Sequence, residues 1–218
     1  MNVNFEKARE LMVENQLRPN KIKEEKILNL FKNVPKEIFV KPIHQSICYS
    51  DKDFNISIKR GYLKNLHLAQ IITNAEIKNT DKVLHVGGLT GYLSVLIGKI
   101  CNELIVLENV DDYIELLQNN FTKNNLDNIK IVNGNLDEGF IKESPYDLII
   151  IDCPIYNLNK IFFDQLSQEG RLIYVEKINN ELAKAYKIIK TNVSFSKEYL
   201  FDVFSEFSID KKNEEFEF

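Results

Sequence analysis

The sequence predicts an α/β fold with a doubly wound, mostly parallel sheet, and three observations carry this prediction. From Thr80 onward, short apolar segments with strand character alternate with amphipathic segments of helical length. The segment 146–151 is almost entirely apolar, as expected for a central parallel strand that is covered on both faces. A glycine turn from Gly87 to Gly91 joins the first of these strands to the helix that follows it.

The individual elements follow in order along the chain. Apolar runs of strand length predict strands over 82–86, 104–107, 129–132, 146–151 and 170–175. Apolar residues at helical spacing predict helices between them over 92–100, 111–124 and 158–166. We therefore expect an alternating core built from five parallel strands.

The two flanks of this core have a different pattern. The segments 5–16 and 23–32 are amphipathic and are separated by the helix breaker "RPN", so they predict an N-terminal helical extension. After the core, 182–190 predicts a helix and the Phe-rich segment 193–209 predicts one or two antiparallel strands. The tail "KKNEEFEF" fits either a short edge strand or a disordered end.

Length and composition indicate one domain. A chain of 218 residues with 44% hydrophobic residues supports one sizeable core, and no linker or repeat marks a second. We expect a single domain over 1–218, with N-terminal helices and a substrate loop (1–66), a cofactor-binding core (67–180) and a C-terminal helix with antiparallel strands (181–218).

Charge and cysteine usage narrow the classes of partner. The formal net charge of −4 weighs against nucleic acid as a partner. No apolar run approaches the ~20 residues that span a bilayer, and the first 16 residues lack the apolar core of a signal peptide. The three cysteines and three histidines have no metal-ligand spacing. We expect a soluble, cytoplasmic protein without a metal site or a membrane partner.

The glycine turn has the features of a nucleotide site. In an open parallel sheet, ligands lie beyond the carboxyl ends of the strands, and glycines at the first turn allow the backbone to approach them. Glu108 ends the next strand, 21 residues after Gly87 (108 − 87 = 21), where a carboxylate can accept both hydroxyls of a ribose.

Two types of cofactor could bind at the glycine turn and Glu108. The dinucleotide pattern GxGxxG requires glycines at 87, 89 and 92, and only Gly87 matches because the other two are Leu89 and Tyr92. The looser pattern GxGxG, which suits S-adenosylmethionine because that cofactor has no pyrophosphate, matches at Gly87 and Gly91. The sequence therefore favours S-adenosylmethionine.

The third strand end offers a further candidate. Asn135 follows that strand, where a polar side chain can reach the exocyclic amine of adenine, although it can equally be a turn residue. The full set of predicted cofactor-binding residues is Gly87, Gly88, Leu89, Thr90, Gly91, Glu108, Asn109, Asn135, Leu136 and Asp152.

Motifs over most of the chain resemble those of one family. The segments are "MVENQLRPN" at 12–20, "VPKEIFV" at 34–40, "CYSD" at 48–51, "VGGLTGY" at 86–92, "SPYDLIIID" at 144–152 and "QLSQEGRLI" at 165–173. In order and spacing they resemble the protein-L-isoaspartate O-methyltransferases from about Phe5 to Val175. The resemblance implies a class I S-adenosylmethionine-dependent methyltransferase fold, which is Rossmann-like.

The resemblance also implies a reaction and a substrate. The cofactor's methyl group would pass to the carboxylate of an isoaspartyl residue in a damaged protein. An ionised carboxylate is already a competent nucleophile at neutral pH, so no strong general base is required. The enzyme would contribute mainly alignment of the reactants and exclusion of water.

The chain departs from the family at its substrate loop. The family reads Gln-Thr-Ile-Ser-Gln-Pro where this chain has Arg60 to Asn65, so its active-site serine is replaced by Leu63. A leucine side chain cannot donate a hydrogen bond to a carboxylate. Lys64 could hold a substrate carboxylate by charge or be a solvated loop residue. Leu63, Lys64 and Asn65 are the predicted catalytic positions.

Further departures lie at the cofactor side. The acidic residue that the family has two positions before its first glycine is His85, and the middle glycine is Leu89. The family's Asp and Gly after the third strand are Asn135 and Leu136. The side chain of Leu89 could cover the methionine part of the cofactor or block it.

Two other functions remain open at the level of sequence. Asp152, Cys153 and Pro154 follow the fourth strand, where amino-group methyltransferases have Asp/Asn-Pro-Pro-aromatic, so a different methyl acceptor is one alternative. The other is a methyltransferase-shaped module that binds the cofactor, or nothing, and acts through its flanks. Affinity for the cofactor separates a pure interaction module from an enzyme.

Overall fold

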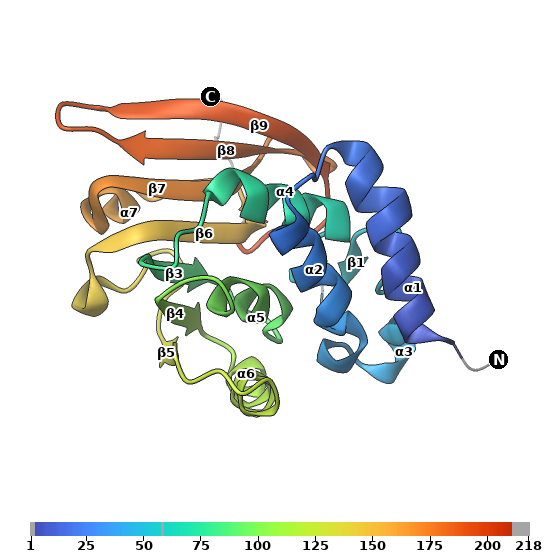
Figure 1. Ribbon diagram of the computed structural model, residues 1–218. Coiled ribbons are helices and arrows are strands. Elements are labelled where there is room, and N and C mark those ends of the chain that lie inside the picture. The colour runs from blue at the N-terminus through green and yellow to red at the C-terminus, as the bar shows by residue number, and fades with distance from the viewer. Residues whose placement is uncertain (1–2, 58, 211–218) are drawn as a thin grey trace, which may run out of the picture.

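The computed structural model describes residues 3–57 and 59–210; the tail considered above lies outside these ranges. A seven-stranded sheet forms the centre of the described chain (Figure 1). Its strands, in spatial order, are β5 (Ile129–Asn133), β4 (Glu103–Glu108), β3 (Lys82–Val86), β6 (Tyr146–Ile155), β7 (Leu166–Lys177), β8 (Leu182–Lys190) and β9 (Phe195–Phe204). The first five run parallel, and β8 is antiparallel to both of its neighbours.

Helices surround this sheet and precede it. They are α1 (Phe5–Met12), α2 (Glu25–Asn33), α3 (Pro42–Gln45), α4 (Asn65–Ala75), α5 (Tyr92–Gly98), α6 (Asp111–Lys123) and α7 (Ile161–Asp164). A π-helical segment (Val13–Leu17) and the 3-10 turns Arg18–Asn20, Lys36–Phe39 and Ile141–Glu143 complete the helical elements. A hairpin of β1 (Phe54–Asn55) and β2 (Gly61–Tyr62) forms a second, two-stranded sheet.

The apolar alternation of the strands divides the core between two faces of the sheet. One cluster joins Val83, Val106 and Leu148 to buried residues of α4 and α5 and of the N-terminal helices. The other cluster contains Leu84, Ile149 and the side chain of Phe162 from α7. Helices therefore cover mainly one face, with α1 and α2 packed at one end of the molecule (Figure 1).

The structure confirms the predicted fold class and corrects two elements. The segment 182–190 is strand β8 and not a helix. Its alanines and lysines favour helix by intrinsic propensity, but Ala183, Ala185 and Ile188 are buried on a strand that pairs with both β7 and β9. Tertiary pairing therefore outweighs local propensity. The predicted helix 158–166 is also shorter, because only the four residues of α7 are α-helical.

The strand order determines where a ligand can lie. The chain leaves β3 for β4 and β5 on one side and returns to β6 on the other side of β3. The loops after β3 and β6 therefore diverge and leave a crevice at the carboxyl edge of the sheet. The residues predicted to bind the cofactor lie after β3 and β5, at the end of β4 and within the last part of β6.

Candidate functional site

The glycine turn is fixed by close backbone packing. Gly87 and Gly91 have positive φ angles of 82° and 95°, which glycine adopts at little cost. A Cβ on Gly88 would lie 2.3 Å from Cγ1 of Val106, so no side chain fits there without movement. Gly91 is the N-cap residue of α5. The three predicted glycines therefore shape the turn itself.

Leu89 also has a positive φ angle, although it is not a glycine. Its φ angle is 53°, in the left-handed region that a branched side chain rarely adopts. The side chain is 5% exposed and belongs to the hydrophobic core on the helical face. Leu89 thus packs into the protein, and its backbone N–H donates a hydrogen bond to Oε2 of Glu108 at 2.9 Å.

Glu108 lies at the end of β4 and is completely buried. Its Oε1 accepts hydrogen bonds from the backbone N–H groups of Asn109 at 2.9 Å and Val110 at 3.3 Å. Together with the Leu89 N–H, three backbone donors orient the carboxylate toward the crevice. This arrangement has the position and chemistry of an acceptor for a ribose diol.

Arg60 is the partner of this carboxylate. Its Nη1 lies 3.2 Å from Oε1 of Glu108 and its Nη2 lies 2.9 Å from Oε2, a bidentate pair. Arg60 is only 6% exposed, and burial opposes its charge while Glu108 raises the pKa of the guanidinium above its usual value. The same guanidinium lies over the ring of Tyr113, with Cζ 5.6 Å from the ring centroid.

A cavity of about 630 Å³ lies beside this ion pair. It is lined by Ser57, Lys59, Arg60, Asn109, Val110, Tyr113, Leu136 and Ile209. The apolar side chains of Val110, Tyr113 and Leu136 provide surfaces against which a planar base can pack. Asn109 and Leu136, two of the predicted binding residues, therefore line the same cavity as Arg60, which pairs with Glu108.

The crevice has the types of residue and cavity that a site for S-adenosylmethionine requires. The crevice has a glycine turn, a strand-end carboxylate and an apolar cavity of suitable type for an adenosine. The guanidinium of Arg60, however, lies on the oxygens of Glu108 that the ribose hydroxyls would use. The residues fit the cofactor once Arg60 leaves that position.

Three other predicted cofactor residues have local roles in the structure. The exposed Asn135 binds Glu138 through its amide at 2.8 Å and accepts from the Asp137 N–H at 3.1 Å, which is the role of a turn residue. The Thr90 carbonyl accepts from the Asn120 amide at 2.8 Å. The third residue, Asp152, belongs to a buried network of hydrogen-bonded side chains.

His85 connects the members of this network. Nε2 of His85 lies 3.1 Å from Oδ1 of Asp152, and Nδ1 of His85 lies 2.8 Å from Oγ of Ser94. His85 thus links β6 to α5 through side chains. The residue that replaces the family's acid is a packed histidine whose two ring nitrogens both have partners.

The predicted catalytic positions are separated by the fold. Leu63 is 1% exposed and is part of the hydrophobic core. Asn65 is fully buried, accepts a hydrogen bond from Nζ of Lys36 at 3.0 Å and donates one to the carbonyl of Cys48 at 2.9 Å. Lys64 lines a second cavity, where its ammonium pairs with Asp51 at 3.1 Å.

Lys36 packs against the start of α4. Its ammonium is fully buried and lies 5.0 to 5.3 Å from the centroids of three rings, those of Phe54, Tyr62 and Tyr92. Burial lowers the pKa of Lys36 to about 8. Since Lys36 also binds Asn65, this cluster connects the N-terminal region to the substrate loop.

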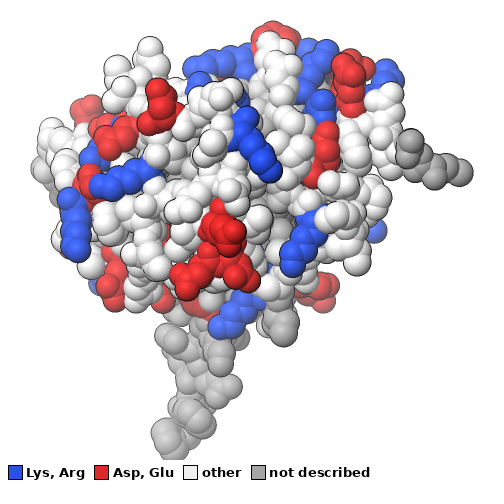
Figure 2. All heavy atoms as spheres, turned by 90° about the horizontal axis from the view of Figure 1, so that it is seen from below, with Lys and Arg blue, Asp and Glu red and all other residues white. Residues whose placement is uncertain are grey.

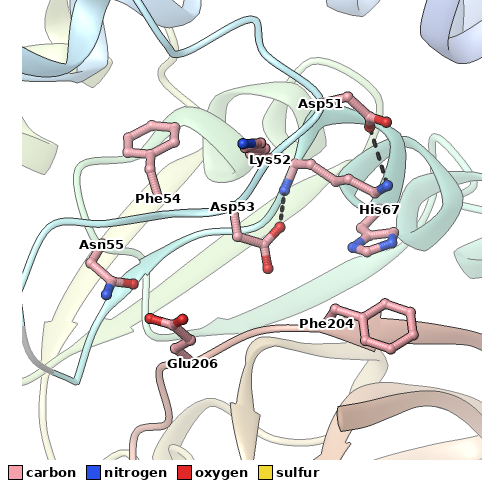
Figure 3. A pocket seen from close by; sticks show the side chains of 9 residues that line it. Asp51, Lys52, Asp53, Phe54, Asn55, His67, Phe204 and Glu206 are labelled. Carbon is pink, nitrogen blue, oxygen red and sulfur yellow. Dashed lines mark hydrogen bonds and ion pairs between the residues drawn. The ribbon is translucent and has the colours of Figure 1, made fainter. Parts of the chain in front are cut away.

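The second cavity, of about 380 Å³, is shown in Figure 3. The side chains of Asp53 and Glu206 face it from two different segments, and His67 lies at one end. Burial raises the pKa of Asp53 to about 6, and burial lowers the pKa of His67 to about 4. Oδ2 of Asp53 and Nδ1 of His67 are buried and have no hydrogen-bond partner among residues 3–57 and 59–210.

Sequence reasoning missed three residues that define the first cavity. In the sequence, Arg60 stands out only because it replaces the family's glutamine, and nothing in one sequence indicates that it pairs with Glu108, 48 residues away. Val110 and Tyr113 follow Glu108 closely. Their apolar character just after the predicted ribose acceptor is the signal that could have identified them.

The face that Figure 2 shows has a mixed charge. Acidic side chains gather near its middle, and Lys and Arg side chains lie at separate places around them. Over its described part, this face therefore presents no continuous basic surface. Within residues 3–57 and 59–210, no helix is both long enough and apolar enough to cross a membrane.

Comparison with known proteins identifies the family. The sequence model of the family described as protein-L-isoaspartate(D-aspartate) O-methyltransferase matches residues 6–204. The protein-L-isoaspartate O-methyltransferase of Koribacter versatilis is 27% identical over 169 residues, which are 78% of this chain and 76% of the relative. That of Petrotoga mobilis is 28% identical over 176 residues, with coverage of 78% and 81%.

Solved structures give the same result for the fold. A protein-L-isoaspartate O-methyltransferase from Plasmodium falciparum, in complex with S-adenosyl-L-homocysteine, superposes with a TM-score of 0.77 at 22% identity, covering 96% of this chain and 99% of that chain. A second solved structure, of a protein-L-isoaspartate O-methyltransferase, superposes with a TM-score of 0.76 at 20% identity and covers 93% of this chain and 66% of that chain. The predicted fold and the family resemblance are confirmed: the chain belongs to the protein-L-isoaspartate(D-aspartate) O-methyltransferase family.

Proposed function

We propose that this protein transfers the methyl group of S-adenosylmethionine to isoaspartyl carboxylates of damaged proteins, acting in the cytoplasm as a single methyltransferase domain. The observation that carries the proposal is the joint position of the glycine turn and Glu108 at the switch point of the sheet. Family membership and the names of the relatives support the substrate class.

The adenosine end of the cofactor is assigned to the first cavity. Glu108 would accept the ribose hydroxyls, and Val110, Tyr113 and Leu136 would pack against the adenine. Leu89 contributes its backbone N–H, which orients the Glu108 carboxylate, and keeps its side chain in the core. The bound cofactor supplies an electrophilic sulfonium methyl group.

The protein's residues then have to align a carboxylate and exclude water. Because an ionised carboxylate is nucleophilic at neutral pH, the absence of the family serine at position 63 does not remove a required base. Lys64 belongs to the loop that aligns with the family's substrate-binding positions, and it lines the second cavity. We assign the second cavity to the peptide that flanks the isoaspartyl residue.

A methyl-transfer assay tests the proposal. The purified protein is mixed with radiolabelled S-adenosylmethionine and a peptide that contains one isoaspartyl residue, and the same peptide with normal aspartate is the matched control. We expect base-labile label on the isoaspartyl peptide only. Label on neither peptide, with a folded protein that binds S-adenosylhomocysteine, would assign the site to another acceptor.

Glu108→Ala provides the control for the site. A folded Glu108→Ala variant should lose most of its affinity for S-adenosylhomocysteine, because the ribose hydroxyls lose their acceptor. Unchanged affinity would refute the assignment of Glu108.

A further inference from the structure

We propose that Arg60 is an internal competitor of the cofactor: its guanidinium holds the position of the ribose hydroxyls on Glu108 and must leave before the cofactor binds. This inference rests on the proposed function and adds a determinant of cofactor affinity to it. It predicts that the wild-type protein binds the cofactor more weakly than a variant in which Arg60 cannot pair with Glu108.

The first step is the saturation of Glu108. A carboxylate offers about four lone-pair positions. Three backbone N–H groups and two guanidinium N–H groups already point at the two oxygens of Glu108, at 2.9 to 3.3 Å. The backbone donors belong to the fold, whereas Arg60 is a side chain. Two ribose hydroxyls can therefore bind Glu108 only by replacing Arg60.

The second step is the similarity in shape between the guanidinium and the ribose diol that would replace it. A guanidinium presents two parallel N–H donors, one to each carboxylate oxygen, and a ribose diol presents two O–H donors in a similar way. Arg60 also extends over the glycine turn, since its Nη2 lies 3.2 Å from where a Cβ on Gly87 would be. The side chain thus fills the space between the turn and the first cavity.

The third step is the attachment of Arg60. It ends the connection between the two-residue strands β1 and β2, which pair with each other and not with the main sheet. Its backbone N–H donates to Oγ of Ser57 at 3.1 Å, and its carbonyl accepts from the N–H groups of Ile56 and Ser57 at 2.8 Å each. These local bonds allow the arginine side chain to leave Glu108 without opening the main sheet.

The cost of release lowers the apparent affinity. If only one molecule in ten to one in a hundred has Arg60 away from Glu108, the apparent dissociation constant rises about 10-fold to 100-fold, because it scales with the inverse of the competent fraction. Removing the competitor should recover this factor.

Calorimetric titration with S-adenosylhomocysteine tests the inference. The proteins are wild type, Arg60→Gln, which has the family's residue, and Arg171→Gln. The last is the matched control, because Arg171 is also buried and pairs with the carboxylate of Asp81 at the opposite edge of the sheet. Circular dichroism and thermal unfolding establish that each protein is folded at the titration temperature.

The expected result is a dissociation constant about 10-fold or more lower for Arg60→Gln than for wild type, with Arg171→Gln unchanged. Equal or weaker binding by folded Arg60→Gln, while wild type binds, would overturn the competitor and leave the proposed function intact. No binding by either protein would refute the cofactor assignment itself, and the inference with it.

A measurement on the wild-type chain keeps the test decisive if Arg60→Gln does not fold. The chain has four arginines, so the guanidinium Nε–H signals are few enough to assign by NMR. Addition of S-adenosylhomocysteine should shift the Arg60 signal and increase its exchange with water. An unmoved Arg60 signal at saturation would contradict displacement.

Discussion

The Arg60–Glu108 pair should dominate the stability of the crevice, and the two single substitutions should differ in cost. Removing one partner of a buried ion pair costs about 3–5 kcal/mol, because the other charge stays buried without compensation. In Arg60→Gln, the Glu108 carboxylate keeps its three backbone N–H donors, so we expect a cost near 3 kcal/mol.

Glu108→Gln should be the more damaging change. It leaves the Arg60 guanidinium buried without its carboxylate, and an amide nitrogen replaces one of the two acceptors of the backbone N–H groups. We expect a cost near 5 kcal/mol for this variant. The double variant contains no buried charge at this position, so it should cost about 2–3 kcal/mol less than the sum of the two single changes.

Urea unfolding of the four proteins measures this cycle. The free energies of unfolding are compared at pH 7.5 without ligand, and the slopes with denaturant show whether the transition remains two-state. Single-variant costs that add to within about 0.5 kcal/mol would refute the reasoning, because independent sites are additive and a buried bidentate pair is not.

Three further predictions concern the loop and the second cavity. Leu63→Ser should lower the free energy of unfolding by about 3–5 kcal/mol, because Leu63 lies in the core; a loss under 1 kcal/mol in urea unfolding would contradict this. Asp53→Asn should stabilise the protein by up to about 3 kcal/mol at pH 7.5 and lose this advantage by pH 4. The raised pKa of about 6 means that the folded wild type binds the extra proton below pH 6, so wild type loses stability as pH rises through 6; an advantage that does not depend on pH would contradict it. His67→Phe should remove up to about 3 kcal/mol of acid sensitivity. The lowered pKa of about 4 means that wild type loses stability as pH falls from 6.5 to 4, and thermal unfolding across this range should show a smaller decline for the variant.

The sequence predicts the central part of the fold because its signals are local. Each strand from β3 to β7 contains a short apolar run, and the distance between Gly87 and Glu108 follows from one βαβ unit. The segment 182–190 could not be assigned in the same way. Its strand character comes from pairing with β7 and β9, which are recognised only once the sheet is assembled.

In the candidate site too, the residues that could be predicted are those with a local sequence signal. Glu108 ends β4 at the spacing from Gly87 that the pattern predicts, and Leu136, which the family resemblance indicated, lines the first cavity, whereas Asn135 lies one residue from the cavity lining and binds Glu138. The contact between Arg60 and Glu108 joins a hairpin to a strand end across 48 residues. A long-range ion pair of this kind leaves no local pattern in a single sequence.

A crystal structure of the protein with S-adenosylhomocysteine tests the central claim most directly. The account predicts that both ribose hydroxyls bind the carboxylate of Glu108, that the adenine lies against Val110 and Leu136, and that the guanidinium of Arg60 has left Glu108. A ligand bound elsewhere, or a bound ligand beside an intact Arg60–Glu108 pair, would contradict it.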